Sequence, residues 1–150
     1  TEVNIDGSVV SADLDGIIAT NAGTGGVTIR DTNVTAGGVG IDASGSAGKV
    51  EITNAIVDAG GDGIVLSDTS VYGNVINNLD ITAGEDGLVA ENTNSLTVNL
   101  TEDGNILTMG GSGIRAEGST ILAINSLNDN KLDLTTGGRR HRSCRRSNSQ

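Results

Sequence analysis

The sequence predicts an all-β fold, a right-handed single-stranded parallel β-helix (solenoid) with about five coils of roughly 24 residues each. Three observations lead to this prediction. A glycine-containing motif recurs at a nearly constant interval, apolar residues occupy fixed positions around it, and large side chains are almost absent. The chain has 23 glycines, no proline, no tryptophan or phenylalanine and one tyrosine. Regular stacking of small aliphatic side chains is therefore favoured over an irregularly packed core.

The repeat is clearest in VDAGGDGIVL (57–66), and its pattern returns in VTAGGVGIDA, ITAGEDGLVA and LTMGGSGIRA. The shared glycine, here called the reference glycine, occurs at Gly16, Gly40, Gly63, Gly87 and Gly113, with intervals of 24, 23, 24 and 26 residues. Four positions around it are apolar in every copy, namely one and three residues after it and four and six residues before it. Because each pair is two residues apart, we expect two short strands that each bury one face.

These four positions define columns of equivalent residues. The two columns before the glycine end with Leu107 and Met109. The column one residue after it is Ile17, Ile41, Ile64, Leu88 and Ile114. The column three residues after it is Ala19, Ala43, Leu66, Ala90 and Ala116. A further strand is expected earlier in each coil, at Val3–Ile5, Val27–Ile29 and Val50–Ile52, weakening at Asn74–Ile76 and shifting to Val98–Leu100. The shift predicts a small insertion before Gly104.

Two kinds of corner separate these strands. Nine residues before the reference glycine stand Gly7, Asp31, Asn54, Asn78 and Gly104, residue types that tolerate the left-handed backbone region. The reference glycines themselves are expected where the backbone bends or takes a positive φ. Stacked about 4.8 Å apart, the coils would pair in parallel and form ladders of like side chains.

The β-helix is predicted for residues 1–134. A disordered glycine-rich segment would not keep apolar residues at fixed positions, and a β-sandwich of hairpins would not repeat its pattern at a fixed interval of about 24 residues. The remaining residues, TTGGRRHRSCRRSNSQ (135–150), have no aliphatic side chain and five arginines. A basic tail could bind nucleic acid or an acidic surface, but we favour a disordered terminus, a non-native extension or an out-of-frame product. His141 and Cys144 are too few ligands for a zinc site.

Charge and hydropathy limit the partners. The net charge of -10 divides into -15 before residue 135 and +5 after it. The acidic body repels polyanions, so no nucleic acid partner is expected for it. No apolar run approaches ~20 residues, so the body is not expected to be membrane-embedded. The single cysteine, Cys144, excludes an internal disulfide.

Acidic residues offer two calcium candidates. GGVGIDAS (37–44) matches the start of a calcium-binding nonapeptide, but no second copy follows nine residues later. The better candidate is the column before the reference glycine, with Asp15, Asp62 and Asp86, and Glu85 beside it. Solvated carboxylates are the simpler interpretation, so we predict no metal site and no cofactor.

No catalytic residue is assigned either. The body lacks histidine and cysteine, which removes the usual nucleophile systems. The carboxylate pairs Glu85–Asp86 and Glu102–Asp103 lack an aromatic platform, and Arg30 and Arg115 lie too many coils apart to cooperate.

The AGGDGI-type coils of residues 1–134 resemble the parallel β-helix passenger regions of bacterial autotransporter and inverse-autotransporter adhesins. The resemblance implies a non-catalytic stalk or adhesin segment of an exported bacterial protein, extracellular or at the cell surface. Its partners would be a host glycan or surface protein, and its open β-helix ends could self-associate. Pectate lyases, polygalacturonases and phage tailspikes share the architecture, so the alternative is a polysaccharide-active lyase or hydrolase lacking part of its groove.

Overall fold

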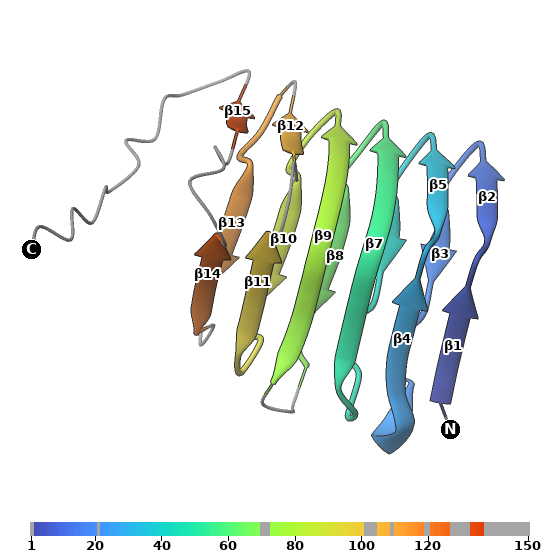
Figure 1. The fold of residues 1–150 in the computed structure, drawn as a ribbon, viewed down its shortest axis with the longest axis vertical. Helices are drawn as coiled ribbons and strands as arrows, with labels where there is room; N and C mark the ends of the chain where they lie inside the picture. The colour runs from blue at the N-terminus through green and yellow to red at the C-terminus, as the bar shows by residue number, and fades with distance from the viewer. Residues whose placement is uncertain are drawn as a thin grey trace, which may run out of the picture.

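A computed structural model describes residues 2–20, 22–69, 73–100, 105–108, 110–118, 121–126 and 133–136. The described strands form two parallel sheets that lie face to face (Figure 1). The chain ascends the front sheet, crosses over, descends the rear sheet and begins the next turn beside the first, which gives a right-handed winding (Figure 1). The predicted parallel β-helix is confirmed.

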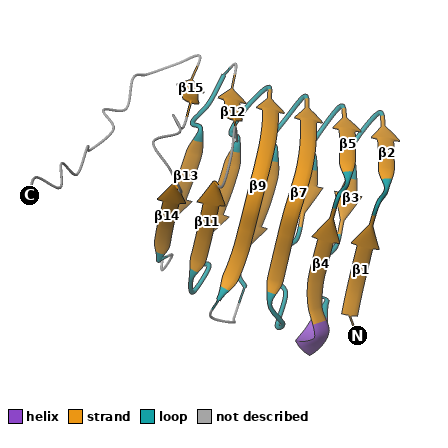
Figure 2. Ribbon diagram, in the orientation of Figure 1, coloured by secondary structure: helices purple, strands orange, loops and turns teal. Residues whose placement is uncertain are grey.

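The first sheet contains ten strands. They are β1 (Glu2–Asp6), β2 (Val9–Ala12), β4 (Gly26–Arg30), β5 (Asn33–Ala36), β7 (Val50–Ala59), β9 (Asn74–Ala83), β11 (Leu96–Leu100), β12 (Asn105–Thr108), β14 (Leu122–Ser126) and β15 (Asp133–Thr136). The second sheet contains β3 (Ile17–Ile18), β6 (Ile41–Asp42), β8 (Ile64–Ser67), β10 (Leu88–Glu91) and β13 (Ile114–Glu117). Among the described residues the one helical element is the 3-10 turn η1 (Gly23–Gly25), purple in Figure 2.

The number of turns is slightly smaller than predicted. The described chain makes about four full turns, whereas the sequence repeat predicts about five. Strand pairing continues to Thr136 in β15, two residues beyond the predicted end of the β-helix. The rest of the tail, 137–150, lies outside the described residues.

The core consists of the predicted apolar columns. Ile17, Ile41, Ile64, Leu88 and Ile114 are successive partners in the second sheet, so they lie in single file. The three central members, Ile41, Ile64 and Leu88, are fully buried. Stacking equivalent side chains removes apolar surface from water in every turn, worth about 25 cal/mol per Å². The periodic pattern therefore determines which face of each strand is buried.

The corner between the first two strands has the predicted backbone. Gly7, Asp31, Asn54 and Asn78 have φ of 56°, 47°, 53° and 53°. In β7 and β9 the corner is so slight that the two predicted strands form one ten-residue strand. Gly104, the fifth predicted corner, lies outside the described residues.

The reference glycines lie at bends of the backbone, as predicted, but without the positive φ that was the other expectation. Gly16, Gly40 and Gly63 do not have a positive φ. A Cβ on Gly40 would lie 2.5 Å from the carbonyl oxygen of Gly63 in the next turn and would also meet Val57. These glycines are needed because adjacent turns approach too closely for any side chain. The cost of replacing them would come from a steric clash with the next turn and not from an unfavourable φ.

The predicted register is wrong in the last part of the repeat. The prediction aligns Leu107 with Ile81, whereas Ile106 pairs with Ile81 and Thr108 pairs with Ala83. Upstream, Leu96 and Val98 pair with Asn74 and Ile76, where the prediction aligns Val98 and Leu100. The predicted insertion before Gly104 is larger than expected, because a shortened turn before Leu96 hides part of it when positions are counted back from Gly113. Met109, the last predicted column member, lies outside the described residues.

Candidate functional site

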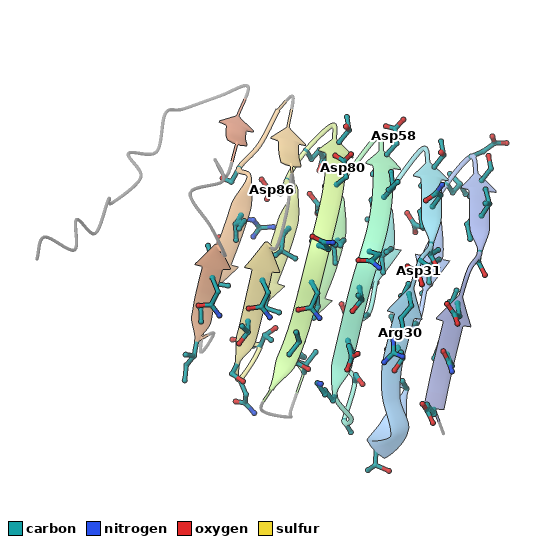
Figure 3. All side chains as sticks on the ribbon, viewed as in Figure 1. Arg30, Asp31, Asp58, Asp80 and Asp86 are labelled. Carbon is teal, nitrogen blue, oxygen red and sulfur yellow. The ribbon has the colours of Figure 1, made fainter. Side chains whose placement is uncertain are left out.

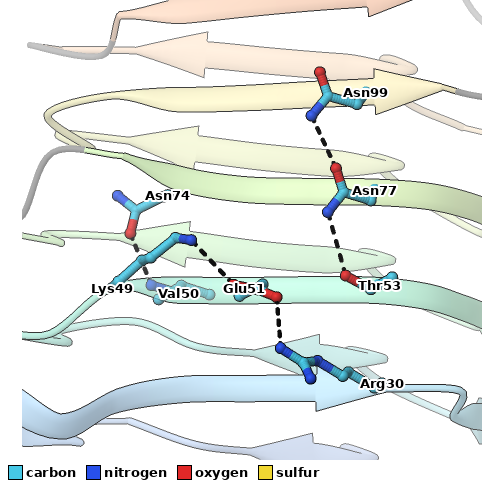
Figure 4. Close-up of polar contacts among 8 residues, drawn as sticks. All are labelled: Arg30, Lys49, Val50, Glu51, Thr53, Asn74, Asn77 and Asn99. Atoms are coloured by element: carbon cyan, nitrogen blue, oxygen red, sulfur yellow. Dashed lines mark hydrogen bonds and ion pairs between the residues drawn. The ribbon is translucent and has the colours of Figure 1, made fainter.

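The outer face of the first sheet carries a ladder of amide side chains. Asn77 donates a hydrogen bond to Thr53 Oγ1 (3.3 Å), Asn99 donates to Asn77 Oδ1 (2.8 Å), and Asn125 donates to Asn99 Oδ1 (2.9 Å). Figure 4 shows the first two of these bonds crossing from strand to strand. An amide can donate to one neighbour and accept from the other, so equivalent asparagines stack without leaving a polar group unpaired.

A second amide ladder follows the positive-φ corner. Asn54 donates to Asp31 Oδ1 (2.8 Å), and Asn78 donates to Asn54 Oδ1 (3.2 Å). Asn92 donates to Asp68 Oδ1 in the same manner at another corner (3.3 Å). The two ladders give the rod a repeating array of outward amides and carboxylates.

An ion-pair cluster lies beside the first ladder. Glu51 accepts from Arg30 Nη2 (2.7 Å) and from Lys49 Nζ (3.0 Å), as Figure 4 shows. The hydrogen bond from Lys49, and then that from Arg30, lowers the pKa of Glu51 below its ordinary value of 4.5. The cluster joins two adjacent turns through β4 and β7.

This pKa shift predicts a pH-dependent contribution to stability. Because the folded-state pKa is lowered, the stabilisation is present above the unfolded-state pKa and is lost as the pH falls through the folded-state value. Glu51→Gln is expected to lower the free energy of unfolding by about 0.5 kcal/mol at about pH 7, since the pairs are partly exposed. Urea unfolding at about pH 7 and about pH 3 measures this, and the difference from the parent protein should become smaller at the lower pH. An equal difference at both pH values would contradict the ion-pair explanation.

The carboxylates of the candidate calcium column, Asp15, Asp62 and Asp86, accept hydrogen bonds from backbone N–H groups. Asp15 Oδ1 accepts from the N–H of Val39 (2.9 Å), and Asp62 Oδ1 accepts from the N–H of Asp86 (2.9 Å). Asp86 Oδ1 accepts from the N–H of Ser112 (2.7 Å), and its Oδ2 pairs with Arg115 Nε (2.5 Å). Each carboxylate thus bonds to the next turn.

The bonding of Asp62 leads to a prediction that distinguishes a backbone ladder from a calcium site. Asp62→Asn keeps the acceptor oxygen and is expected to change the free energy of unfolding by less than about 0.5 kcal/mol, whereas Asp62→Ala should lower it by about 1 kcal/mol. Thermal and urea unfolding with a chelator and with added Ca²⁺ provides the measurement. A melting temperature that falls on chelation, or an Asn variant as destabilised as the Ala variant, would favour the metal.

The other candidate residues are not brought together. Arg30 lies on β4 of the first sheet and Arg115 on β13 of the second, and Figure 3 shows Arg30 far along the rod from Asp86, the partner of Arg115. Glu85 is exposed. Within the described ranges, no three His, Cys, Asp or Glu side chains cluster closely enough to hold a metal ion. Glu102, Asp103, His141 and Cys144 lie outside those ranges.

One buried polar network, centred on Asn74, was not predicted from the sequence. Asn74 is fully buried in an otherwise apolar column. Its Oδ1 accepts from the N–H of Val50 (2.9 Å), and its Nδ2 donates to Thr69 Oγ1 (3.0 Å) and the carbonyl of Ser95 (3.0 Å). In the preceding turn the N–H of Val27, equivalent to Val50, instead donates to a backbone carbonyl, that of Lys49. The asparagine side chain therefore replaces a backbone acceptor at this corner.

The weakening of the apolar pattern at Asn74 is the signal that could have revealed this network. A buried amide needs partners on both its oxygen and its nitrogen. A polar residue in an apolar column therefore indicates a site where the regular ladder is interrupted.

The fold and the outer ladders define the chain as a parallel β-helix protein. Comparisons with protein-family models, with curated proteins and with solved structures returned no match. In the part of the chain that the structure describes, no helix has the length and hydropathy needed to span a membrane.

Proposed function

We propose that this chain is a non-catalytic segment of an exported bacterial surface protein, in which the β-helix acts as a rigid stalk or an adhesive surface. The observation that carries the proposal is the unbroken bonding between turns. Parallel backbone pairing links every turn to the next, and the Thr53–Asn77–Asn99–Asn125 ladder adds side-chain bonds along the outside. A rod bonded in this way resists bending and keeps its outer face in a constant geometry.

The adhesive part of the proposal rests on the outward residues. Ser11, Thr35 and Asp58 form an exposed column on the first sheet, and Thr82 continues it with partial exposure. Hydroxyl and carboxylate groups repeated from turn to turn can pair with the hydroxyls of a glycan or with an extended peptide. The partner proposed is a host glycan or surface protein, and the location is extracellular or at the cell surface.

Single-molecule pulling from the two ends tests the stalk. We expect stepwise extension, in which one turn releases about 80 Å of contour length, because about 24 residues extend at about 3.4 Å each. Extension at low force without steps would contradict a load-bearing role.

Binding to an array of glycans, compared between the parent and the double variant Asp58→Lys/Thr35→Lys, tests the adhesive face. An affinity that does not change in the variant would remove this column from the proposal.

The enzymatic alternative is tested separately. Incubation with acidic polysaccharides should release no new reducing ends and no unsaturated products. Cleavage that depends on protein concentration would replace the stalk by a polysaccharide-active enzyme.

A further inference from the structure

An N-glycosylation sequence lies on the outer face of the first sheet. Asn33, Val34 and Thr35 match Asn-x-Ser/Thr, the acceptor sequence for attachment of a sugar to an asparagine amide. They belong to β5, which pairs with β2 on one side and β7 on the other (Figure 1). Burial alternates along β5, so Val34 is in the core while Asn33 and Thr35 are exposed on the same face. Both side chains that define the acceptor are therefore accessible to an enzyme.

A second copy of this sequence has a different environment. Residues 99–101, NLT, also match Asn-x-Ser/Thr. Asn99 is partly buried, its Nδ2 donates to Asn77 Oδ1 (2.8 Å), and its Oδ1 accepts from Asn125 (2.9 Å). The side chain of Asn33, by contrast, makes no hydrogen bond among the described residues. A sugar on Asn99 would interrupt the amide ladder, whereas a sugar on Asn33 would leave the ladders intact.

The neighbours of Asn33 are suited to contact with a sugar. In the strand register Asn33 pairs with Val9 of β2 and with Ile56 of β7. Both neighbours are exposed apolar residues, and Ile56 is 51% exposed although strands lie on both sides of it. A sugar attached at Asn33 reaches this apolar surface, and the C–H groups of its ring remove part of the surface from water.

We propose that Asn33 is an N-glycosylation site and that its first sugar lies over Ile56. In the reaction Asn33 Nδ2 forms a bond to C1 of a nucleotide-activated sugar, and the bond between C1 and the phosphate oxygen breaks. The nucleoside diphosphate leaves, and the amide nitrogen gives up one proton. The inference rests on one part of the proposed function, the exposure of an exported chain to a glycosyltransferase, and not on the stalk or the adhesive column.

Glucosylation of the folded, full-length chain in solution tests the site. The protein is incubated with UDP-glucose and a purified asparagine glucosyltransferase specific for Asn-x-Ser/Thr, and is then denatured and cleaved with trypsin and a glutamate-specific protease. These proteases separate the two acceptor sequences into fragments 31–49 and 92–102. Mass spectrometry is expected to find one hexose on fragment 31–49 and none on fragment 92–102.

Cleavage before the incubation is the control for the fold. Both short fragments should then be modified, because neither can keep the pairing between turns. This result would show that the transferase accepts both sequences and that the folded structure makes only Asn33 available.

Three variants test the acceptor itself. Asn33→Gln and Thr35→Ala should lose the hexose, and Thr35→Ser should retain it because serine keeps the hydroxyl that the sequence requires. Since both positions are exposed, all three variants should melt at the temperature of the unmodified parent.

The melting temperature tests the contact with Ile56. The glucosylated parent is expected to melt about 2 °C above the unmodified protein, because the sugar covers apolar surface. Ile56→Ser should remove this difference.

Two results would overturn the assignment of Asn33, namely no hexose on the folded chain and equal modification of the two fragments after incubation of the folded chain. A rise of the same size in Ile56→Ser would overturn the contact with the sugar. Because purified components replace export, and because pulling the unmodified chain tests the stalk, failure here is distinguishable from failure of the proposed function.

Discussion

Asn74→Val is expected to lower the free energy of unfolding by about 3 kcal/mol, although it restores the apolar pattern of its column. Equivalent residues in that column are Val27, Val50 and Leu96, so sequence periodicity alone predicts stabilisation. The structure predicts the opposite result. Valine would leave the N–H of Val50 and the carbonyl of Ser95 without the bonds that Asn74 provides. Each buried polar group left unpaired costs about 1–3 kcal/mol.

Urea unfolding measures this change. Asn33→Val is the matched control, because Asn33 is an exposed strand residue, and it should change the free energy of unfolding by less than about 0.5 kcal/mol. Asn74→Asp tests the direction of the bonds, since aspartate keeps an acceptor for Val50 but cannot donate to Ser95 when ionised. If Asn74→Val were as stable as the parent, the network would not explain the residue.

Gly40→Ala is the second change with a large expected effect. We expect a loss of about 3 kcal/mol or more, because the added methyl group meets a carbonyl oxygen and the Val57 side chain in the fully packed interior. The carbonyl belongs to Gly63 and is held by Ile41, whose N–H donates to it (2.9 Å). Relief of the clash would therefore separate two turns and weaken the bonds between them.

Gly7→Ala separates steric space from backbone conformation. Gly7 has a φ of 56° and nothing within 4 Å of an added Cβ. This variant should lose about 1 kcal/mol, the usual cost of the left-handed region for alanine. Thermal and urea unfolding of both variants gives the comparison. A Gly40→Ala variant no less stable than Gly7→Ala would show that the turns are not as closely packed as the structure indicates.

Much of the fold could be predicted because the relevant preferences are local. Alternation of apolar residues identifies the inward face of each strand, and Asp31, Asn54 and Asn78 mark the corner through their tolerance of positive φ. The interval between reference glycines then indicates the length of a turn. The register around Leu96 was predicted wrongly because a shortened turn hides part of the insertion that follows it within the same interval.

The candidate site could be predicted only in part. The repeat places Asp62 and Asp86 in one column, but their bonds to backbone N–H groups of the next turn depend on atomic spacing between turns. Glu51 was predicted to face outward, and its pairing with Arg30 depends on residues 21 positions apart in the chain. The role of Asn74 was missed because periodicity indicates burial but not which groups lack a partner.

The sequence by itself determined the coil length, the inward and outward faces and the residues that turn the corner, since side-chain alternation and φ preference act over a few residues. Only the tertiary structure decided why the reference glycines are required, which acceptor serves Val50, and how carboxylates and amides link the turns. These features depend on contacts between residues more than 20 positions apart, where differences of an ångström determine whether a methyl group fits or a hydrogen bond forms.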